Sequence, residues 1–236
     1  MTAPLISCVM PTWNRHRFLP TALRCFARQT WPRRELILVS DDDTPPPIPD
    51  GLSSAVRLIH LPRNTSTGAK LNIGIQAARG SIIQKLDDDD WYAPTFLETH
   101  AGHLLAIPAE ARDATLIARC CYLILLAGDH DLTPRFSGHG WNTGSSLAFW
   151  KSLWMRHRFP DRHVGEDSAF IRDSGARPIR VCDNKAAEHI VVRHHDNSWT
   201  RMTTGHADDY YRACPPHPQT LDELIPPDDF SAISSI

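Results

Sequence analysis

The first half of the chain carries short apolar runs separated by segments with helical spacing. Four runs have the length of buried strands, at residues 5–10, 35–40, 56–61 and 82–86. Between the first two runs, apolar side chains recur on one face of a helix, namely Phe18, Leu19, Leu23, Phe26 and Ala27. This stretch therefore predicts a strand, a helix and a second strand in succession.

A second helix is predicted between the third and fourth runs. Its N-cap is Thr65, Ser66 or Thr67, because a side-chain hydroxyl accepts a hydrogen bond from the free N–H groups of the first turn. Gly80 is predicted as the left-handed residue that closes the helix. The apolar side chains of this helix are Leu71, Ile73, Ile75 and Ala78.

The alternation of strands and helices predicts an α/β fold. Such an order is typical of a mainly parallel sheet with right-handed connections and helices on both faces. Pro94 suits the first turn of a further helix over residues 95–106. The most apolar stretch, residues 120–127, has the length of a buried strand and is far too short to cross a bilayer, so we expect no membrane span.

Polar side chains follow three of the predicted strands directly. The first strand leads into Pro-Thr-Trp-Asn-Arg at residues 11–15, the second into three aspartates at residues 41–43, and the fourth into four aspartates at residues 87–90. Ligands bind beyond the carboxyl ends of the strands in parallel sheets. If these strands are neighbours, we expect the three polar segments to meet in one cleft.

The four adjacent carboxylates of residues 87–90 repel one another. Each needs a raised pKa or a nearby cation to lie at the end of a buried strand. An acidic turn in solvent is the alternative, but the position after a strand favours a site. Mg²⁺ and Mn²⁺ bind carboxylate oxygens and leave positions for water and phosphate. We therefore expect Mn²⁺ or Mg²⁺ as the cofactor.

Trp13 and Asp42 indicate how a nucleotide base is bound. Trp13 offers a flat face for stacking, although a packing role for it is equally open. The carboxylate of Asp42 can accept a hydrogen bond from the N3–H of uracil or thymine, which cytosine lacks, unless residues 41–43 form only a turn. A uridine or thymidine nucleotide is therefore favoured, and Lys70 is a candidate to meet its diphosphate.

Composition narrows the class of protein. The 236 residues are 42% hydrophobic, which is enough for one large domain, and the formal net charge of -2 gives no electrostatic footprint for nucleic acid. Six cysteines are scattered without a CxxC pair, and several lie in apolar runs where free thiols behave as small hydrophobes. These features, with no signal peptide at the N-terminus, predict a reduced, cytoplasmic protein.

The segments described above resemble a known family, the inverting glycosyltransferases of family 2. The similarity lies in five segments that follow the family pattern in order, at residues 9–15, 29–32, 35–42, 74–80 and 86–94. It is clear over residues 5–105 and looser to about residue 200. The resemblance implies a Rossmann-like GT-A fold, a nucleotide-sugar donor, a divalent cation held by a DxD element, and a later acid that acts as base.

The resemblance also implies which residues bind the donor. The DxD element corresponds to residues 87–89, with Asp87 and Asp89 as metal ligands and Asp89 as the more direct contact. Asp88 then serves the ribose or an ordered water. The remaining nucleotide-binding residues are Pro11, Thr12, Trp13, Asp42 and Lys70.

The catalytic acids and a third metal ligand come from later in the chain. Glu166 and Asp167 resemble the acidic pair of the family at a helix start, with Asp167 as the base, although such a pair also complements a helix dipole. A late histidine element implies a metal ligand. Successive strand side chains point to opposite faces, so only one of His194 and His195 faces the site. The distance from Asn197 favours His194.

We expect three segments along the chain. Residues 1–105 form the nucleotide-sugar-binding half, residues 106–214 the acceptor and catalytic half of the same GT-A domain, and residues 215–236 a proline-rich tail that docks on the body or on a partner. Trp141 lies in a glycine-rich loop where relatives line the sugar pocket. It either stacks on a sugar or serves packing.

The predicted function is transfer of a single sugar from a UDP-sugar, or a dTDP-sugar, to an acceptor hydroxyl. The resemblance implies inversion at the anomeric carbon, and the need for a metal and a base follows from the chemistry. Two other classes stay open. One is a sugar nucleotidyltransferase, which would need a glycine-rich basic loop after the first strand. The other is a module that binds nucleotide-sugar without transferring it.

Overall fold

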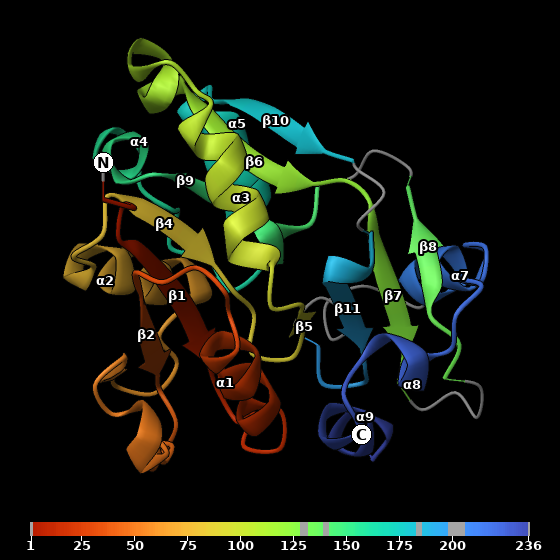
Figure 1. Cartoon of the computed structure of the whole chain (residues 1–236). Helices are drawn as coiled ribbons and strands as arrows, with labels where there is room; N and C mark the ends of the chain where they lie inside the picture. Colours follow the sequence, from red (N-terminus) through yellow and green to blue (C-terminus); the bar gives the residue numbers. More distant parts are fainter. Residues whose placement is uncertain (1, 128–131, 139–141, 183–185, 198–205, 236) are drawn as a thin grey trace.

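The computed structural model describes residues 2–127, 132–138, 142–182, 186–197 and 206–235. A large sheet and a smaller sheet lie beside each other (Figure 1). The strands are β1 (Ile6–Thr12), β2 (Arg34–Ser40), β3 (Val56–His60), β4 (Ile82–Lys85), β5 (Trp91–Tyr92), β6 (Thr115–Arg119), β7 (Tyr122–Leu126), β8 (Arg135–Ser137), β9 (Ala148–Trp150), β10 (Arg177–Val181) and β11 (His189–Arg193).

The large sheet has the order β10-β6-β9-β4-β1-β2-β3. All neighbouring strands are parallel except at β9, which runs antiparallel to β4 and to β6. The smaller sheet has the order β5-β11-β7-β8. The expected α/β class with a mainly parallel sheet is therefore confirmed, while the antiparallel direction of β9 and the separate smaller sheet were not predicted.

Helices cover both faces of the large sheet. They are α1 (Leu19–Ala27), α2 (Thr67–Ala77), α3 (Phe96–Leu105), α4 (Lys151–Arg156), α5 (Glu166–Ser174), α7 (His206–Arg212), α8 (Leu221–Leu224) and α9 (Pro227–Ser234). Side chains alternate along β1, so Cys8 and Met10 pack against α1 on one face while Val9 packs with α2, α4 and α5 on the other. This alternation explains why both sides of the strand are apolar.

The second helix ends earlier than predicted. Ser66 is its N-cap and accepts a hydrogen bond from the N–H of Ala69 at 3.1 Å, but the helix stops at Ala77 and Ala78 is already extended. Gly80 has no left-handed φ, so its predicted role as the closing residue is wrong. A Cβ on Gly80 would lie 2.7 Å from Ser7 Oγ, and glycine is required there for close approach to β1.

The expectation that the cysteines are free thiols is wrong for one pair. Cys121 and Cys182 form a disulfide with a Cα–Cα distance of 4.8 Å across 61 residues of sequence. Sequence spacing could not reveal this pair, because Cys121 lies two residues after β6 and Cys182 directly after β10, and only the parallel pairing of these strands brings their ends together. Cys8, Cys25, Cys120 and Cys214 are free and buried.

The proline-rich tail docks on the body of the protein. Leu221, Ile225 and Ile233 are buried in the same apolar cluster as α1 and β1. The buried carboxylate of Asp229 receives Arg24 Nε at 2.9 Å and Trp91 Nε1 at 2.9 Å, and it also pairs with Arg28. Across the residues that the structure describes, no helix is both long enough and apolar enough to cross a membrane.

Candidate active site

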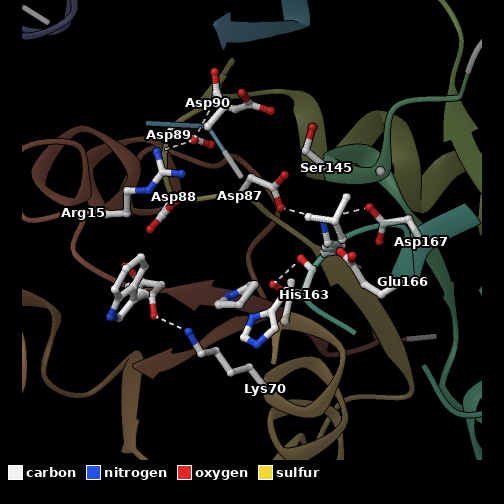
Figure 2. Close-up of a pocket in the computed structure, with 18 of the residues that line it drawn as sticks. Arg15, Lys70, Asp87, Asp88, Asp89, Asp90, Ser145, His163, Glu166 and Asp167 are labelled. Atoms are coloured by element: carbon white, nitrogen blue, oxygen red, sulfur yellow. Dashed lines mark hydrogen bonds and ion pairs between the residues drawn. The ribbon is translucent and has the colours of Figure 1, made fainter. Parts of the chain in front are cut away.

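The carboxyl ends of β4, β1 and β2 lie side by side and open into one cavity. The strands are neighbours in the sheet, as the sequence analysis required for convergence. The cavity has a volume of about 1460 Å³, and both Trp13 and Asp89 line it. The other lining residues come mostly from the ends of the strands, from the loop before β9 and from the start of α5 (Figure 2). They include Pro11, Thr12, Asn14, Arg15, Asp41, Lys70, Lys85, Asp87, Asp88, Asp90, Asn142, Thr143, Gly144, Ser145, Glu166 and Asp167.

We call the four aspartates of residues 87–90 the acid run. Its first two members have raised pKa values and are hard to ionise. Burial, partly offset by Lys85, raises the pKa of Asp87 to about 7. Burial and the charge of Asp89 raise the pKa of Asp88 to about 8. Asp88 Oδ2 is buried and has no hydrogen-bond partner among the described residues. A buried carboxyl oxygen without a hydrogen-bond partner is costly, so this position favours a ligand that can hydrogen-bond to it.

Asp89 is in a different environment. Its Oδ2 accepts hydrogen bonds from Arg15 Nη1 at 2.8 Å and from Asn197 Nδ2 at 3.0 Å, and it lies 3.1 Å from His194 Nε2. Burial alone would raise the pKa of Asp89, but the hydrogen bond with His194 and the charge of Arg15 bring it below its ordinary value. Asp89 is therefore the carboxylate of the run that is kept ionised by its neighbours.

His194 rather than its neighbour lies against the acid run. β11 ends at Arg193, and the next side chain turns inward, where the His194 ring stacks on Phe18 with centroids 4.2 Å apart. His195 is exposed. Asn197 caps the arrangement, because its Oδ1 accepts the His194 N–H at 2.6 Å. The strand itself begins at His189.

Asp90 is held by contacts with β11. Its Oδ1 accepts the backbone N–H of Val192 at 3.1 Å, and its Oδ2 lies 3.2 Å from His189 Nε2. Both partners belong to β11. Asp90 therefore ties the acid run to the smaller sheet, which holds His194 in reach of Asp89.

A buried lysine connects the acid run to the acidic pair of α5. Lys85 Nζ donates to Asp87 Oδ1 at 2.6 Å and lies 3.4 Å from Asp167 Oδ2, so the two carboxylates face each other across it (Figure 2). Burial alone would lower the pKa of Lys85, but Asp167 and Asp87 raise it above its ordinary value. The ammonium therefore stays charged between the two acids.

The start of α5 positions Glu166 and Asp167. Gly165 has a left-handed φ of 78°, which turns the chain into the helix, and both acids fall in the first turn, where they complement the helix dipole. Burial, and then the charge of Asp167, raise the pKa of Glu166 to about 8. Glu166 is therefore mostly protonated at neutral pH.

The nucleotide end of the cavity is formed by the loops after β1 and β2. The Trp13 side chain is 42% exposed, which leaves a face open for stacking. Lys70 is buried, pairs with Asp41 and donates to the Thr12 carbonyl at 2.9 Å. Asp41 lines the cavity, whereas the carboxylate of Asp42 accepts the Asn14 N–H and the Ser40 hydroxyl.

Three residues of the site were not assigned from the sequence. They are Arg15, Lys85 and Gly144. Arg15 lies inside a segment that was assigned for its tryptophan, and Lys85 has a recognisable signal, since a lysine inside an apolar strand must be paired when buried. Gly144 borders the predicted sugar-pocket tryptophan, Trp141, which lies outside the described residues. No sequence signal links Gly144 to Asp167.

Asp89 and His194 bring together two donor atoms of the kind that hard divalent cations take. Among the described residues, Asp87 does not join them in a group of three ligand atoms within 4.8 Å of one another. Asp89 Oδ2 and His194 Nε2 are 3.1 Å apart, close to the separation of about 3 Å expected between adjacent ligands of an octahedral ion bound at about 2.1 Å. One or two carboxylates commonly suffice when substrate phosphates complete such a site. Arg15 Nη1 lies 2.9 Å from His194 Nε2 and 2.8 Å from Asp89 Oδ2. The guanidinium and a metal ion would therefore compete for the lone pairs of these two atoms.

Comparisons with known proteins agree with this geometry. Residues 7–120 match the family described as Glycosyl transferase family 2. An uncharacterized glycosyltransferase of Haemophilus influenzae is 27% identical over 213 residues, covering 86% of this chain and 81% of that protein. The uncharacterized glycosyltransferase EpsJ of Bacillus subtilis is 31% identical, covering 84% of this chain and 64% of EpsJ.

Solved structures share the fold. The mannosyltransferase PcManGT from Pyrobaculum calidifontis, solved with GDP-Man and Mn²⁺, has a TM-score of 0.58 at 19% identity over 90% of this chain. TarS residues 1–349 of S. aureus has a TM-score of 0.57 at 16% identity over 80% of this chain. The chain spans 62% and 60% of these two structures. The first half of the chain, over residues 7–120, is therefore similar to glycosyl transferase family 2, and the chain has the GT-A fold of these enzymes.

Proposed function

We propose that this protein transfers one sugar from a UDP-sugar, or a dTDP-sugar, to an acceptor hydroxyl with inversion, and that it requires Mn²⁺ or Mg²⁺. The observation that carries the proposal is the single cavity that holds an exposed tryptophan, the acid run and the acidic pair of α5. The names of its relatives support it, as do solved structures of similar fold, which include TarS with UDP-GlcNAc and PcManGT with GDP-Man and Mn²⁺.

The base and diphosphate of the donor would lie at the ends of β1 and β2. Trp13 stacks on the base, and Asp42 accepts its N3–H through a lone pair left over from Asn14 and Ser40. Pro11 and Thr12 form the adjoining backbone. Lys70 is held by Asp41 within the cavity wall, so it contributes positive charge near the diphosphate without having to move.

The metal would be held by Asp87, Asp89 and His194. A bound divalent ion offsets the negative charge that develops on the leaving nucleoside diphosphate. Asp88 remains available to the ribose. Arg15 has to release Asp89 when the ion binds, and its guanidinium then faces a cavity that contains phosphate, where a second cation is stabilising.

Asp167 would accept the proton of the acceptor hydroxyl. Lys85 fixes one of its oxygens at 3.4 Å, and Oδ1 has no partner among the described residues. Glu166, protonated at neutral pH, is a hydrogen-bond donor rather than a second base. Direct displacement from the face opposite the diphosphate inverts the anomeric carbon. Trp141 is retained in the proposal as a sugar-stacking residue.

The proposal is tested by measuring UDP release from UDP-sugars with Mn²⁺, with Mg²⁺ and with EDTA. We expect metal-dependent release that collapses in Asp89→Ala and in Asp167→Asn. Asp173→Asn is the matched control, because Asp173 lies on the same helix and its side chain is exposed. Turnover that is unaffected by Asp89→Ala and Asp167→Asn would refute the assignment. Donor binding without any release would instead identify a binding module.

A further inference from the structure

Three cysteines gather at the edge of the large sheet, where β6 and β10 end. Cys120 and Cys121 follow β6 directly, and Cys182 follows β10. The two strands are parallel neighbours, with Arg119 opposite Val181 (Figure 1). Cys121 and Cys182 form the disulfide, and all three sulfur atoms lie within 4.8 Å of one another. We call Cys120, Cys121 and Cys182 the cysteine cluster.

The cysteine cluster differs from the other cysteines of the chain. Cys8 and Cys25 are buried singly, and burial raises their pKa, for Cys25 to about 12, so neither forms a thiolate near neutral pH. In the cluster, Cys120 and Cys121 are buried while Cys182 is exposed. The cluster is therefore open to solvent on one side, which gives an ion or a reductant a path to the sulfurs.

We propose that the cysteine cluster, once its disulfide is reduced, binds a thiophilic divalent cation such as Zn²⁺ through three thiolates. A tetrahedral zinc ion with Zn–S bonds of about 2.3 Å holds its sulfurs about 3.8 Å apart. The three sulfur atoms of the cluster lie within 4.8 Å of one another, so small side-chain movements can bring them to that separation. The fourth position faces the exposed side and takes water or a further ligand.

The backbone already fixes the ligands in place. The Cys120 N–H donates to the Val181 carbonyl at 3.1 Å, which closes the two strand ends on each other. Cys121 leads straight into β7, whose side chains are buried. Cys120 and Cys121 are adjacent residues between β6 and β7, which belong to the two sheets. The fold already holds their backbone in place, so metal binding costs little conformational entropy of the chain. The site is preorganised by the fold.

Binding involves two balanced steps. Reduction breaks the Cys121–Cys182 bond with two electrons and two protons, which two molecules of a thiol such as glutathione supply while they become a disulfide. The cation then replaces the thiol protons of the three cysteines as the Zn–S bonds form. Oxidised and metal-bound forms of the cluster are therefore mutually exclusive.

The cluster borders the catalytic cavity without belonging to it. The residue before Cys120 is Arg119, whose carbonyl accepts the Thr143 N–H at 3.0 Å and whose N–H donates to Ser146 Oγ at 2.8 Å. Thr143 lines the cavity. The three sulfur ligands also select different ions from the carboxylates and histidine near Arg15, which suit harder cations.

Co²⁺ and Zn²⁺ titrations test the proposal. The full chain is reduced, freed of reductant without air, and titrated with Co²⁺. We expect a thiolate-to-cobalt charge-transfer band that saturates at one equivalent and disappears when Zn²⁺ is added. The band should be lost in Cys120→Ser and in Cys182→Ser, and in the oxidised protein.

Two controls locate the site. Cys214→Ser removes a buried free thiol elsewhere and should leave the band intact, and Asp89→Ala should also leave it intact because carboxylates give no such band. No band in the reduced wild type would overturn the proposal. So would a band of equal intensity in Cys120→Ser, since the third thiolate would then not bind. Neither result depends on transferase activity.

Discussion

Four chemically identical side chains in the acid run have four different environments. Asp87 pairs with Lys85, Asp88 keeps an oxygen without a partner, and Asp90 anchors β11. Asp89 is held ionised by Arg15 and His194. The sequence predicted that the run needs a cation or raised pKa values, and the structure provides both, at different residues. The protein's own cations, Arg15 and Lys85, supply part of the compensation for which a divalent cation was expected.

Replacing Arg15 tests its competition with the metal. Arg15→Met removes a cation that lies 2.8 Å from Asp89 Oδ2, so the site should bind Mn²⁺ more tightly in the absence of donor. Mn²⁺ titration followed by electron paramagnetic resonance measures this. Arg17→Met is the control, since Arg17 pairs with Asp196 at the surface. Equal or weaker Mn²⁺ binding in Arg15→Met would contradict the competition.

Gly144 leaves the space that the Asp167 carboxylate occupies. A Cβ at Gly144 would overlap Asp167 Oδ2, so Gly144→Ala should displace the carboxylate and abolish UDP release while the protein stays folded. Gly102→Ala is the matched control. Nothing lies within 4 Å of a Cβ at Gly102, which is within α3, and alanine there should stabilise by up to about 1 kcal/mol. Normal release by Gly144→Ala would remove Asp167 from the mechanism.

At the scale of elements, local sequence patterns predicted the order of the strands and helices more accurately than the residues at which they end. The four N-terminal strands and three helices follow the predicted order, and the residue 120–127 run contains the buried strand β7. The end of α2 was missed because Gly80 is required by contact with β1, a constraint that helix-capping patterns do not contain. The direction of β9 was not predicted, because its antiparallel place between β4 and β6 depends on both neighbours.

The contact between α9 and α1 should contribute to stability. Asp229→Ala leaves Arg28 and Trp91 without their buried partner, and we expect a loss of about 3 kcal/mol in the free energy of unfolding, measured in urea. Asp228→Ala, at the exposed neighbouring position, should change stability little. If the two variants unfold alike, the tail is not held by this carboxylate.

The same contact predicts a pH dependence. Burial alone would raise the pKa of Asp229, but hydrogen bonds from Arg28, Trp91 and Arg24 lower it. A lowered folded pKa means that the stabilisation is complete above the unfolded value of about 3.9 and is lost as the pH falls through the folded value. The stability difference between the wild type and Asp229→Ala should therefore shrink on acidification below about pH 4. A constant difference would contradict the assigned ion pair.

At the scale of the whole molecule, the cavity is formed where the two sheets meet. The large sheet supplies the ends of β1, β2 and β4, while the smaller sheet brings Arg193 and the residues after it to the acid run. α5 closes the third side with Glu166 and Asp167. Residues nearly 180 positions apart, such as Arg15 and His194, come within 2.9 Å of each other. Binding at this junction should therefore stabilise the molecule as a unit.

Ligand binding should raise the melting temperature of the entire chain. A ligand that binds only the native state stabilises it by about 2.7 kcal/mol at one hundred times its dissociation constant, so UDP with Mn²⁺ should raise the melting temperature by several degrees. EDTA should remove most of the shift that UDP produces. Trp13→Ala should reduce it with little effect on the unliganded protein, because this side chain is 42% exposed. An equal shift with EDTA would separate nucleotide binding from the metal.

The sequence by itself determined the α/β class, the order of the first strands and helices, and the polar segments that meet beyond them, because these depend on local periodicity and on the geometry of parallel strands. Only the tertiary structure decided what requires distant partners. It paired Cys121 with Cys182, placed Lys85 between Asp87 and Asp167, and docked α9 on α1. Charge compensation and close approach act through space, so no local pattern along the chain records them.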